Sequence, residues 1–196
     1  LLCDKASEIK KNDIFLIIWR SLSQAVVGDT EQSIETLNSI QHRTDLLFLF
    51  SISNYFIQKS AENPDLKLIT QFEQEIQKNN RNLPQFIAKI TSEIAFLFND
   101  YQLAEEIINN SEKTIQTLSI LGWIKMMKGQ FQESEAIFNR ILKDPANSFH
   151  LLTLYGKACL CSKTNQSAEA IQLFARILSK FEFPEINFEK GAIFMS

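Results

Sequence analysis

The stretch that decides the fold runs from Thr114 to Asn147 and reads TIQTLSILGWIKMMKGQFQESEAIFNRILKDPAN. Apolar residues recur at helical spacing on both sides of Gly129, and Pro145 stands near the end of the stretch. A glycine after one periodic run and a proline after the next are typical of helix boundaries. Ser134 lies four residues before Phe138, so one helix face carries a small residue next to a large one. The stretch therefore predicts two antiparallel helices joined by a short turn.

Residues 148–184 repeat this pattern. Leu121-Gly122 aligns with Tyr155-Gly156 at a spacing of 34 residues, and a further 35 residues lead from Gly156 to Gly191. The alignment places about two extra residues in the second turn, between Lys163 and Ser167. A period of this length is typical of stacked helix hairpins. The best-defined repeats are thus 114–147 and 148–184, and we predict that their structural positions are Gly122, Gly129, Ser134, Phe138, Gly156, Ala170, Phe174 and, in a following unit, Gly191.

The rest of the chain has the same character. Five glycines and four prolines in 196 residues leave little material for the turns of an all-β fold. We expect an all-α fold, a right-handed superhelical solenoid of antiparallel helix hairpins that occupies residues 1–196 as a single segment. About eleven helices are expected, over 12–27, 29–40, 46–60, 65–78, 84–97, 101–109, 114–127, 131–142, 148–161, 167–181 and 185–196. Asp29 is expected to cap one of them and Thr44 or Asp45 another.

Charge and composition exclude several classes of protein. Twenty basic and 23 acidic residues give a net charge of −3, without the basic excess of a nucleic-acid-binding protein. The longest apolar run, from Ile14 to Trp19, is far shorter than the roughly 20 residues that span a bilayer. Three cysteines are too few for a disulfide framework and indicate a reducing, intracellular compartment. We therefore expect neither nucleic acid nor direct membrane insertion.

Residue patterns that carry chemistry are missing from the sequence. Cys159 and Cys161 form the only close pair of thiols, and a structural zinc site needs a second pair of ligands. Neither a glycine-rich phosphate loop nor a serine nucleophile elbow occurs. We expect no enzymatic activity, no cofactor, no metal and no small-molecule substrate.

The remaining candidate is a protein-binding surface. In a stack of helix hairpins, the first helices of the hairpins line a concave groove. Residues predicted to face a partner there are Trp123, Met126, Met127, His150, Lys157 and Leu160. Tryptophan and methionine are enriched at adaptable binding surfaces. The alternative, that these side chains pack against the neighbouring hairpin, stays open at this point.

The spacing and residue choice resemble the tetratricopeptide repeat, a helix hairpin of 34 residues. The resemblance covers 114–191 well, and upstream Gly28, Ser33, Leu37 and Ile40 match the second half of a unit. Leu118 and Leu152 stand at the tryptophan position of that repeat, so the units are degenerate. Because the chain begins with Leu1 and residues 185–196 look like the opening helix of another unit, we expect a fragment of a longer array.

A narrower resemblance rests on an ordered series of short motifs. The motifs are Asp13-Ile-Phe, Gly28-Asp-Thr-Glu-Gln-Ser, Asn63-Pro-Asp, Leu154-Tyr-Gly-Lys-Ala-Cys and Phe181-Glu-Phe-Pro. In this series the sequence is similar to the N-terminal part of the tetratricopeptide-repeat-21 family, the long repeat subunit of intraflagellar transport complex A. The resemblance implies a non-catalytic scaffold in retrograde ciliary transport and ciliary cargo entry, located in the cytoplasm and the cilium, with β-propeller and repeat subunits as partners.

Two other interpretations stay open. The Gly-Lys-Ala-Cys motif that begins at Gly156 is also similar to the repeat scaffold of the nuclear RNA polymerase II-associated factor complex. A regulatory repeat domain fused to an enzyme is the third possibility, which only the remainder of a longer chain would reveal.

Overall fold

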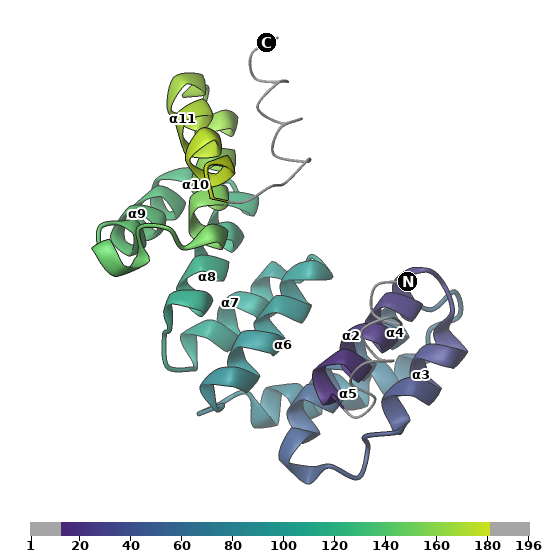
Figure 1. Cartoon of the computed structure of the whole chain (residues 1–196). Helices are drawn as coiled ribbons and strands as arrows, with labels where there is room; N and C mark the ends of the chain where they lie inside the picture. The colour runs from purple at the N-terminus through teal and green to yellow at the C-terminus, as the bar shows by residue number, and fades with distance from the viewer. Residues whose placement is uncertain (1–12, 181–196) are drawn as a thin grey trace. The chain divides into compact units, whose positions relative to one another are not determined.

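The computed structural model describes residues 13–180, and helices make up all the regular structure in that range. Ten α-helices and two single-turn 3-10 helices follow one another, with no strand between residues 13 and 180 (Figure 1). The predicted all-α fold class is confirmed. The predicted final helix and Gly191 lie outside the described residues. The chain divides into two compact units, with the boundary between Asp100 and Tyr101.

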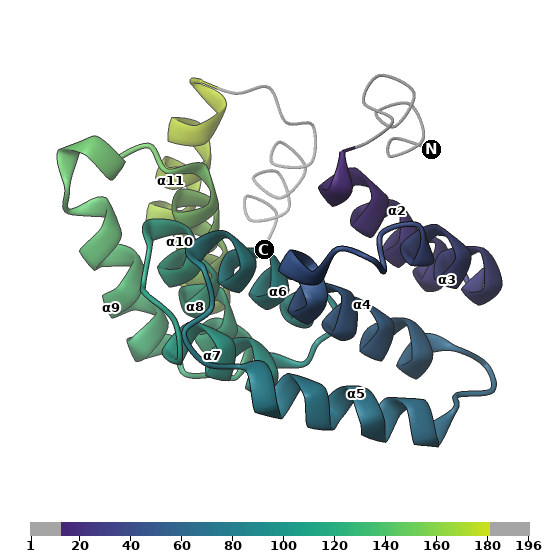
Figure 2. The same cartoon turned by 90° about the horizontal axis from the view of Figure 1, so that it is seen from below.

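Unit 1 is organised around one buried helix. Helix α4 contacts α2, α3, α5 and α6, and every residue from Ser51 to Gln58 is buried. A helix covered on most sides must be apolar around most of its circumference, as the run from Phe48 to Ile57 is. The connections from α2 to α3 and from α4 to α5 lie at one end of this unit (Figure 2). The elements are α2 (Ile14–Val26), α3 (Thr30–Asn38), η1 (Thr44–Leu46), α4 (Leu47–Ser60), α5 (Leu66–Asn79) and α6 (Gln85–Leu97).

Capping in unit 1 agrees with the sequence at one helix and differs at another. The Asp29 carboxylate accepts a hydrogen bond from the Gln32 backbone N–H at 3.3 Å, as predicted for the cap of α3. At α4 the predicted cap is wrong, because a 3-10 turn precedes the helix and its N-cap, Leu46, makes no side-chain hydrogen bond. The Asp45 carboxylate is instead bound by the Arg43 guanidinium through two hydrogen bonds of 2.9 and 2.8 Å.

Serine hydroxyls join the first hairpin. Ser21 Oγ donates to the Ser33 carbonyl at 2.8 Å, and Ser33 Oγ donates to the Ser21 carbonyl at 2.7 Å. Both serines are fully buried. Small side chains at these two positions let α2 and α3 approach closely while the hydroxyl groups stay hydrogen-bonded.

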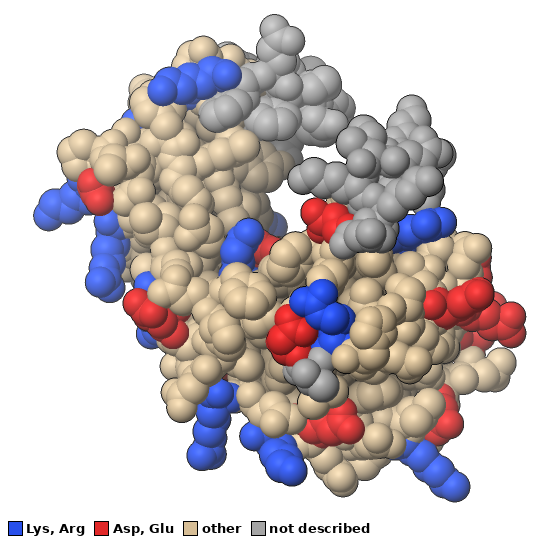
Figure 3. All heavy atoms as spheres, turned by 60° about the horizontal axis from the view of Figure 1, so that its bottom comes forward, with Lys and Arg blue, Asp and Glu red and all other residues tan. Residues whose placement is uncertain are grey.

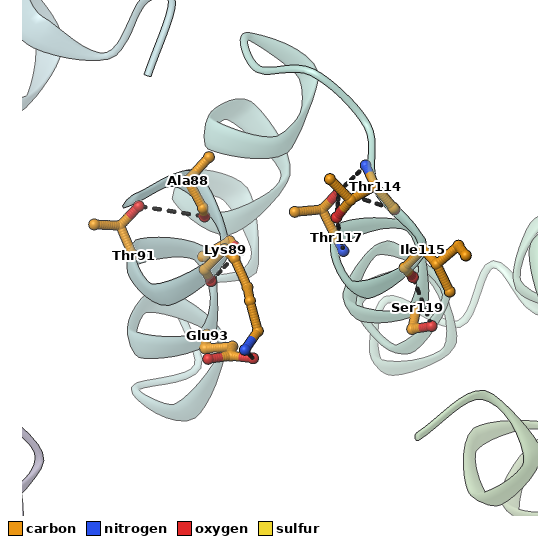
Figure 4. Close-up of polar contacts among 9 residues, drawn as sticks. Ala88, Lys89, Thr91, Glu93, Thr114, Ile115, Thr117 and Ser119 are labelled. Carbon is orange, nitrogen blue, oxygen red and sulfur yellow. Dashed lines mark hydrogen bonds and ion pairs between the residues drawn. The ribbon is translucent and has the colours of Figure 1, made fainter. Parts of the chain in front are cut away.

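Unit 2 consists of a single helix followed by two hairpins. Helix α8 pairs with α9 and α10 with α11, while α10 also contacts α8 and α9 and α7 contacts α8. A capping box starts α8, since Thr117 N donates to Thr114 Oγ1 at 3.2 Å and Thr114 N donates to Thr117 Oγ1 at 2.9 Å (Figure 4). The elements are α7 (Tyr101–Asn109), α8 (Ile115–Met127), α9 (Phe131–Leu142), η2 (Pro145–Asn147), α10 (Leu151–Lys163) and α11 (Ser167–Leu178).

The same three-residue turn ends four first helices. Its central residue has a positive φ: Gly28 at 91°, Asn99 at 61°, Gly129 at 75° and Asn165 at 59°. The N–H of the next residue donates to a carbonyl five residues back, as in Gln130 N to Lys125 O (2.8 Å) and Gln166 N to Cys161 O (2.8 Å). This is the Schellman arrangement, in which glycine or asparagine tolerates the left-handed conformation. Asn99 and Asn165 therefore adopt the left-handed conformation that Gly28 and Gly129 adopt in the other two turns. This role of the two asparagines was not predicted from the sequence.

Substitutions in this turn give a first prediction. Gly129→Ala is expected to lower the free energy of unfolding by about 1–2 kcal/mol, because a Cβ disfavours a positive φ. No atom lies within 4 Å of the position that the Cβ would take, so the loss is conformational and not steric. Asn165→Gly at the equivalent position is the control and is expected to change stability by less than about 0.5 kcal/mol. Chemical denaturation of both variants measures the difference, and equal losses would contradict the assignment of the turn.

These turns correct the predicted register of the repeats. From Gly129 to Asn165 there are 36 residues, and the position seven residues before the turn is Gly122 in α8 but Ala158 in α10. Gly156 is thus not the counterpart of Gly122. The atoms nearest to a Cβ on Gly122 belong to the Phe138 ring, whereas those nearest to a Cβ on Gly156 belong to both Phe138 and Trp123. The two extra residues lie in the connection between the hairpins and not in the second turn.

The remaining repeat positions keep their equivalence in this register. Ser134 and Ala170 both follow the turn residue by five positions, and Phe138 and Phe174 follow it by nine. All four side chains are fully buried. In unit 1, Ser33 and Leu37 occupy the same two positions after Gly28 and are also fully buried. The hairpin is therefore a repeated packing unit, marked by its turn and by a small and a large residue in the second helix.

Candidate protein-binding surface

The residues predicted to line a groove come together where α8 meets α10. Two of them are in the core: Met126 is 2% exposed and Leu160 is 3% exposed, and both pack against the ring of Phe138. The prediction that these two side chains face a partner is wrong, because each is covered by the neighbouring hairpin. For Met126 and Leu160 the alternative interpretation is correct, since both side chains pack between neighbouring hairpins.

Trp123 is half-buried and bridges the two hairpins. Its indole N–H donates to the Leu152 carbonyl at 3.0 Å, and its ring lies 5.6 Å from that of Tyr155. The indole nitrogen would also be 2.8 Å from a Cβ on Gly156, so the glycine allows the ring to lie against α10. Trp123 thus has a structural role, and only its partly exposed side is available to a partner.

His150 belongs to a polar cluster between the same two helices. Its Nδ1 lies 2.8 Å from Thr153 Oγ1 and 3.3 Å from Ser119 Oγ, and the two hydroxyl oxygens are 2.6 Å apart. Ser119 Oγ also donates to the Ile115 carbonyl at 2.8 Å (Figure 4). Ser119 and Thr153 are fully buried, so the cluster is a hydrogen-bonded link inside the joint between α8 and α10.

The bonding of this cluster assigns the tautomer of His150. The only hydroxyl proton of Ser119 goes to the Ile115 carbonyl, so Thr153 must supply the proton between the two hydroxyl oxygens. The contact between Thr153 and His150 then needs a proton on Nδ1 of the imidazole. With the proton on Nε2, the contact between Ser119 and His150 and one of the two contacts of Thr153 would each join two acceptors. The assignment follows from the donors available and is open to direct measurement.

A second prediction concerns this histidine. At neutral pH, nitrogen-15 NMR is expected to find the proton on Nδ1. Burial lowers the pKa of His150 below its usual 6.5, so the folded chain disfavours the charged form. Stability is then fully present above pH 6.5 and falls as the pH drops below that value. His150→Gln is expected to reduce this dependence of stability on pH. A proton on Nε2 would refute the assignment.

The last two predicted residues differ in exposure. The Lys157 ammonium pairs with the Glu169 carboxylate of its own hairpin at 2.7 Å and is largely covered. Met127 is 46% exposed at the end of α8. Of the six predicted partner-binding residues, Met127 thus offers the most open apolar surface, and partner binding by the set stays a prediction.

A charge cluster that the sequence analysis missed joins three helices of unit 2. The Glu105 carboxylate on α7 pairs with Lys125 at 2.8 Å and with Lys128 at 2.7 Å, and Lys125 also pairs with Glu133 on α9 at 2.9 Å. Burial alone would raise the pKa of Glu105, but the hydrogen bonds from Lys125 and Lys128 outweigh it and lower that pKa. Lys125 and Lys128, three residues apart at the end of α8, were the sequence signal for this cluster.

Residues 13–180 were also compared with the requirements of a metal site, a reactive thiol and a membrane-spanning helix. No group of three or more histidine, cysteine or acidic side chains there is placed to hold a metal ion. Burial raises the pKa of the Cys161 thiol to about 11, which keeps it protonated and unreactive at neutral pH. No described helix has the length and apolar character needed to cross a membrane. The face drawn in Figure 3 carries acidic and basic side chains interspersed.

Fold and packing define the class of protein: a helical-repeat protein built from stacked hairpins. The chain belongs to the family described as Tetratricopeptide repeat protein 21 N-terminal ARM repeat, which it matches over residues 1–188. The resemblance stated from the sequence motifs is thereby confirmed. A relative named Tetratricopeptide repeat protein 21 homolog, from Caenorhabditis elegans, is 27% identical over 142 residues. The match covers 68% of this chain and 11% of the relative, so the chain spans about a tenth of the relative's length.

Proposed function

We propose that this chain is a protein-binding scaffold segment of an intraflagellar transport complex A subunit, acting in retrograde ciliary transport and ciliary cargo entry. Membership of the tetratricopeptide repeat protein 21 family is the single observation that carries the proposal. The partners would be other subunits of the assembly, with β-propeller and helical-repeat folds. The place of action would be the cytoplasm and the cilium, and the segment would contribute no chemistry of its own.

The geometry supports a role in holding proteins together. Buried polar links such as Ser119–Thr153 and Ser21–Ser33 fix the positions of adjacent helices within each unit. Repeated hairpins of this kind present long exposed helix faces on a supported core. Such faces suit the recognition of other proteins, where a few residues on a rigid element supply most of the binding energy.

The family match favours this function over the two alternatives left open by the sequence. A scaffold of the nuclear RNA polymerase II-associated factor complex rested on one four-residue motif at Gly156, and that glycine is explained by the close approach of Phe138 and Trp123. A regulatory domain fused to an enzyme would require a catalytic region elsewhere in a longer chain.

Affinity purification of the full-length protein from ciliated cells tests the proposal. Subunits of intraflagellar transport complex A are expected to be recovered in stoichiometric amounts, and depletion of the protein is expected to leave retrograde cargo at the ciliary tip. Recovery of nuclear elongation factors without ciliary subunits would overturn the proposal in favour of the nuclear scaffold. Recovery of an enzymatic activity that depends on this segment would favour the regulatory domain.

A further inference from the structure

We propose that the turn-bearing edge of unit 1 is a docking surface for a segment of a partner protein that carries aliphatic and basic side chains together. We call this surface the turn edge. It consists of residues 26–31 after α2, 59–67 between α4 and α5, and 97–100 after α6. The inference rests on the proposed scaffold role and extends it by naming a surface and the chemistry of what binds there.

The three segments of the turn edge lie at one end of unit 1. Phe56 near the end of α4 stacks on Phe98 at the end of α6, with ring centroids 4.8 Å apart. The Lys59 ammonium lies 3.9 Å from the Asp100 carboxylate, which again joins the ends of α4 and α6. Helix α2 packs beside α4, and its turn lies at the same end as the connection from α4 to α5 (Figure 2).

Exposed aliphatic side chains mark every segment of this edge. Val26 is 70% exposed, Val27 80%, Leu66 72% and Leu97 61%. Val26 and Leu97 each lie two residues before the positive-φ residue of their turn. Lys163 occupies the same position in α10, so the fold does not require an apolar side chain there. Apolar side chains this exposed, on each of three neighbouring segments, are typical of interaction sites.

A shallow, open depression continues from this edge along the exposed face of α5. Its lining residues are Leu66, Lys67, Thr70, Gln71 and Gln74. They recur at intervals of three or four residues, so they form one stripe along the helix. This exposed stripe extends the surface on which an elongated partner segment can lie beyond the aliphatic side chains.

Charge identifies the kind of segment that fits. The turn edge carries five carboxylates against two lysines. Its carboxylates at Asp29, Glu31, Glu62 and Asp65 make no ion pair with any residue between 13 and 180, and those of Asp29 and Asp65 cap α3 and α5. An excess of negative charge beside aliphatic groups attracts lysine and arginine and disfavours anionic lipid headgroups. The occupant is therefore a protein segment with basic and aliphatic residues.

The opposite edge of unit 1 lacks this combination. Phe15, Leu47 and Phe86 are exposed there, at the beginnings of α2, α4 and α6. The charges of residues 13–16, 41–47 and 81–86 balance, with two carboxylates and two arginines, and one pair of these, Arg43 and Asp45, is hydrogen-bonded. This edge therefore supplies a matched control with similar apolar exposure and no net charge.

A designed peptide tests the proposal on the full-length protein. The probe is a fluorescent amphipathic helix of about 18 residues, made of leucine and lysine at helical spacing. Anisotropy is expected to show binding that weakens as salt is raised. Val26→Ser/Val27→Ser/Leu66→Ser is expected to raise Kd at least about tenfold, since apolar burial is lost. Glu31→Gln/Glu62→Gln is expected to weaken binding at low salt.

The matched control is Leu47→Ser/Phe86→Ser, which is expected to bind the peptide like the unchanged protein. All these side chains are exposed, and thermal melting confirms that each variant folds. Equal binding of a leucine–glutamate peptide, or unchanged affinity in the triple variant, would overturn the proposal. Loss of self-association or of phosphatidylserine vesicle binding in the triple variant would assign the edge to a second copy or a membrane instead. The peptide-binding results do not bear on whether affinity purification recovers the ciliary complex. The docking surface and the proposed scaffold function can therefore be refuted independently.

Discussion

Phe138→Ala is expected to lower the free energy of unfolding by about 3–5 kcal/mol, the largest effect of any single change proposed for this chain. The ring is fully buried and packs against Met126 and Leu160. It also lies against the backbones of Gly122 and Gly156, so it fills space in its own hairpin and in the next. Truncation would leave a cavity that neither hairpin can close alone. Chemical denaturation monitored by circular dichroism measures the loss.

Phe131→Ala on the same helix is the matched control. That ring is 36% exposed at the start of α9, so its truncation is expected to cost less than about 1 kcal/mol. Comparable losses in the two variants would show that Phe138 does not hold the joint between the hairpins. A loss confined to α10 and α11 in hydrogen exchange, with α8 and α9 unchanged, would also contradict the shared role.

Gly156→Ala is expected to lower the free energy of unfolding by about 1–3 kcal/mol. In an open helix this change would be stabilising by up to about 1 kcal/mol, because alanine favours the helix. Here a Cβ would lie 2.6 Å from the Phe138 ring and 2.8 Å from the Trp123 indole nitrogen. A shift of the Phe138 ring would disturb its packing against Met126 and Leu160, and a shift of Trp123 would disturb its hydrogen bond to the Leu152 carbonyl. We therefore expect overpacking to outweigh the helix propensity.

Trp123 provides a second readout of that change. Its hydrogen bond to the Leu152 carbonyl depends on the close approach at Gly156, so its fluorescence is expected to shift to the red as the indole meets water. Adding Phe138→Leu to Gly156→Ala is expected to recover part of the loss, since a smaller side chain leaves space for the methyl group. Stabilisation by Gly156→Ala, as at an open helical site, would contradict the packing described.

Local signals in the sequence were sufficient for the fold class. Scarce glycine and proline, apolar residues at helical spacing, and the pairs Ser134–Phe138 and Ala170–Phe174 indicated helix hairpins, because each signal acts within one or two turns of helix. The cap at Asp29 was predictable for the same reason. The cap at α4 was not, since Asp45 had two partners within reach and the Arg43 guanidinium, two residues away, binds it.

The register of the repeats could not be read from the glycines. Gly122 and Gly156 are both buried helical glycines, but the first admits Phe138 of its own hairpin and the second admits two rings of the preceding one. A sequence alignment cannot distinguish these two packing environments, because both positions are simply glycine within a helix. Asn99 and Asn165 were overlooked because asparagine is common in polar connections, and only its backbone conformation reveals the turn.

The candidate surface was harder to predict than the fold. Helix α8 is apolar on most of its sides, so periodicity could not tell which residues face the next hairpin and which face solvent. Met126 and Met127 are adjacent in sequence, and the structure buries one and exposes the other. The distinction depends on where α10 lies, which is information from a distant part of the chain.

The rigid turn inside each hairpin and the variable connection between hairpins have an evolutionary consequence. Three residues link α2 to α3, α8 to α9 and α10 to α11, whereas five residues separate α7 from α8 and eight separate α9 from α10. Insertions and deletions would accumulate between modules, at exposed positions such as 143–146 and not at Phe149 or His150, which contact the hairpins. A search for internal duplication that assumes one fixed length would then lose its phase at every junction, whereas a search anchored on the left-handed residue would recover ancestral copies that ordinary self-alignment overlooks.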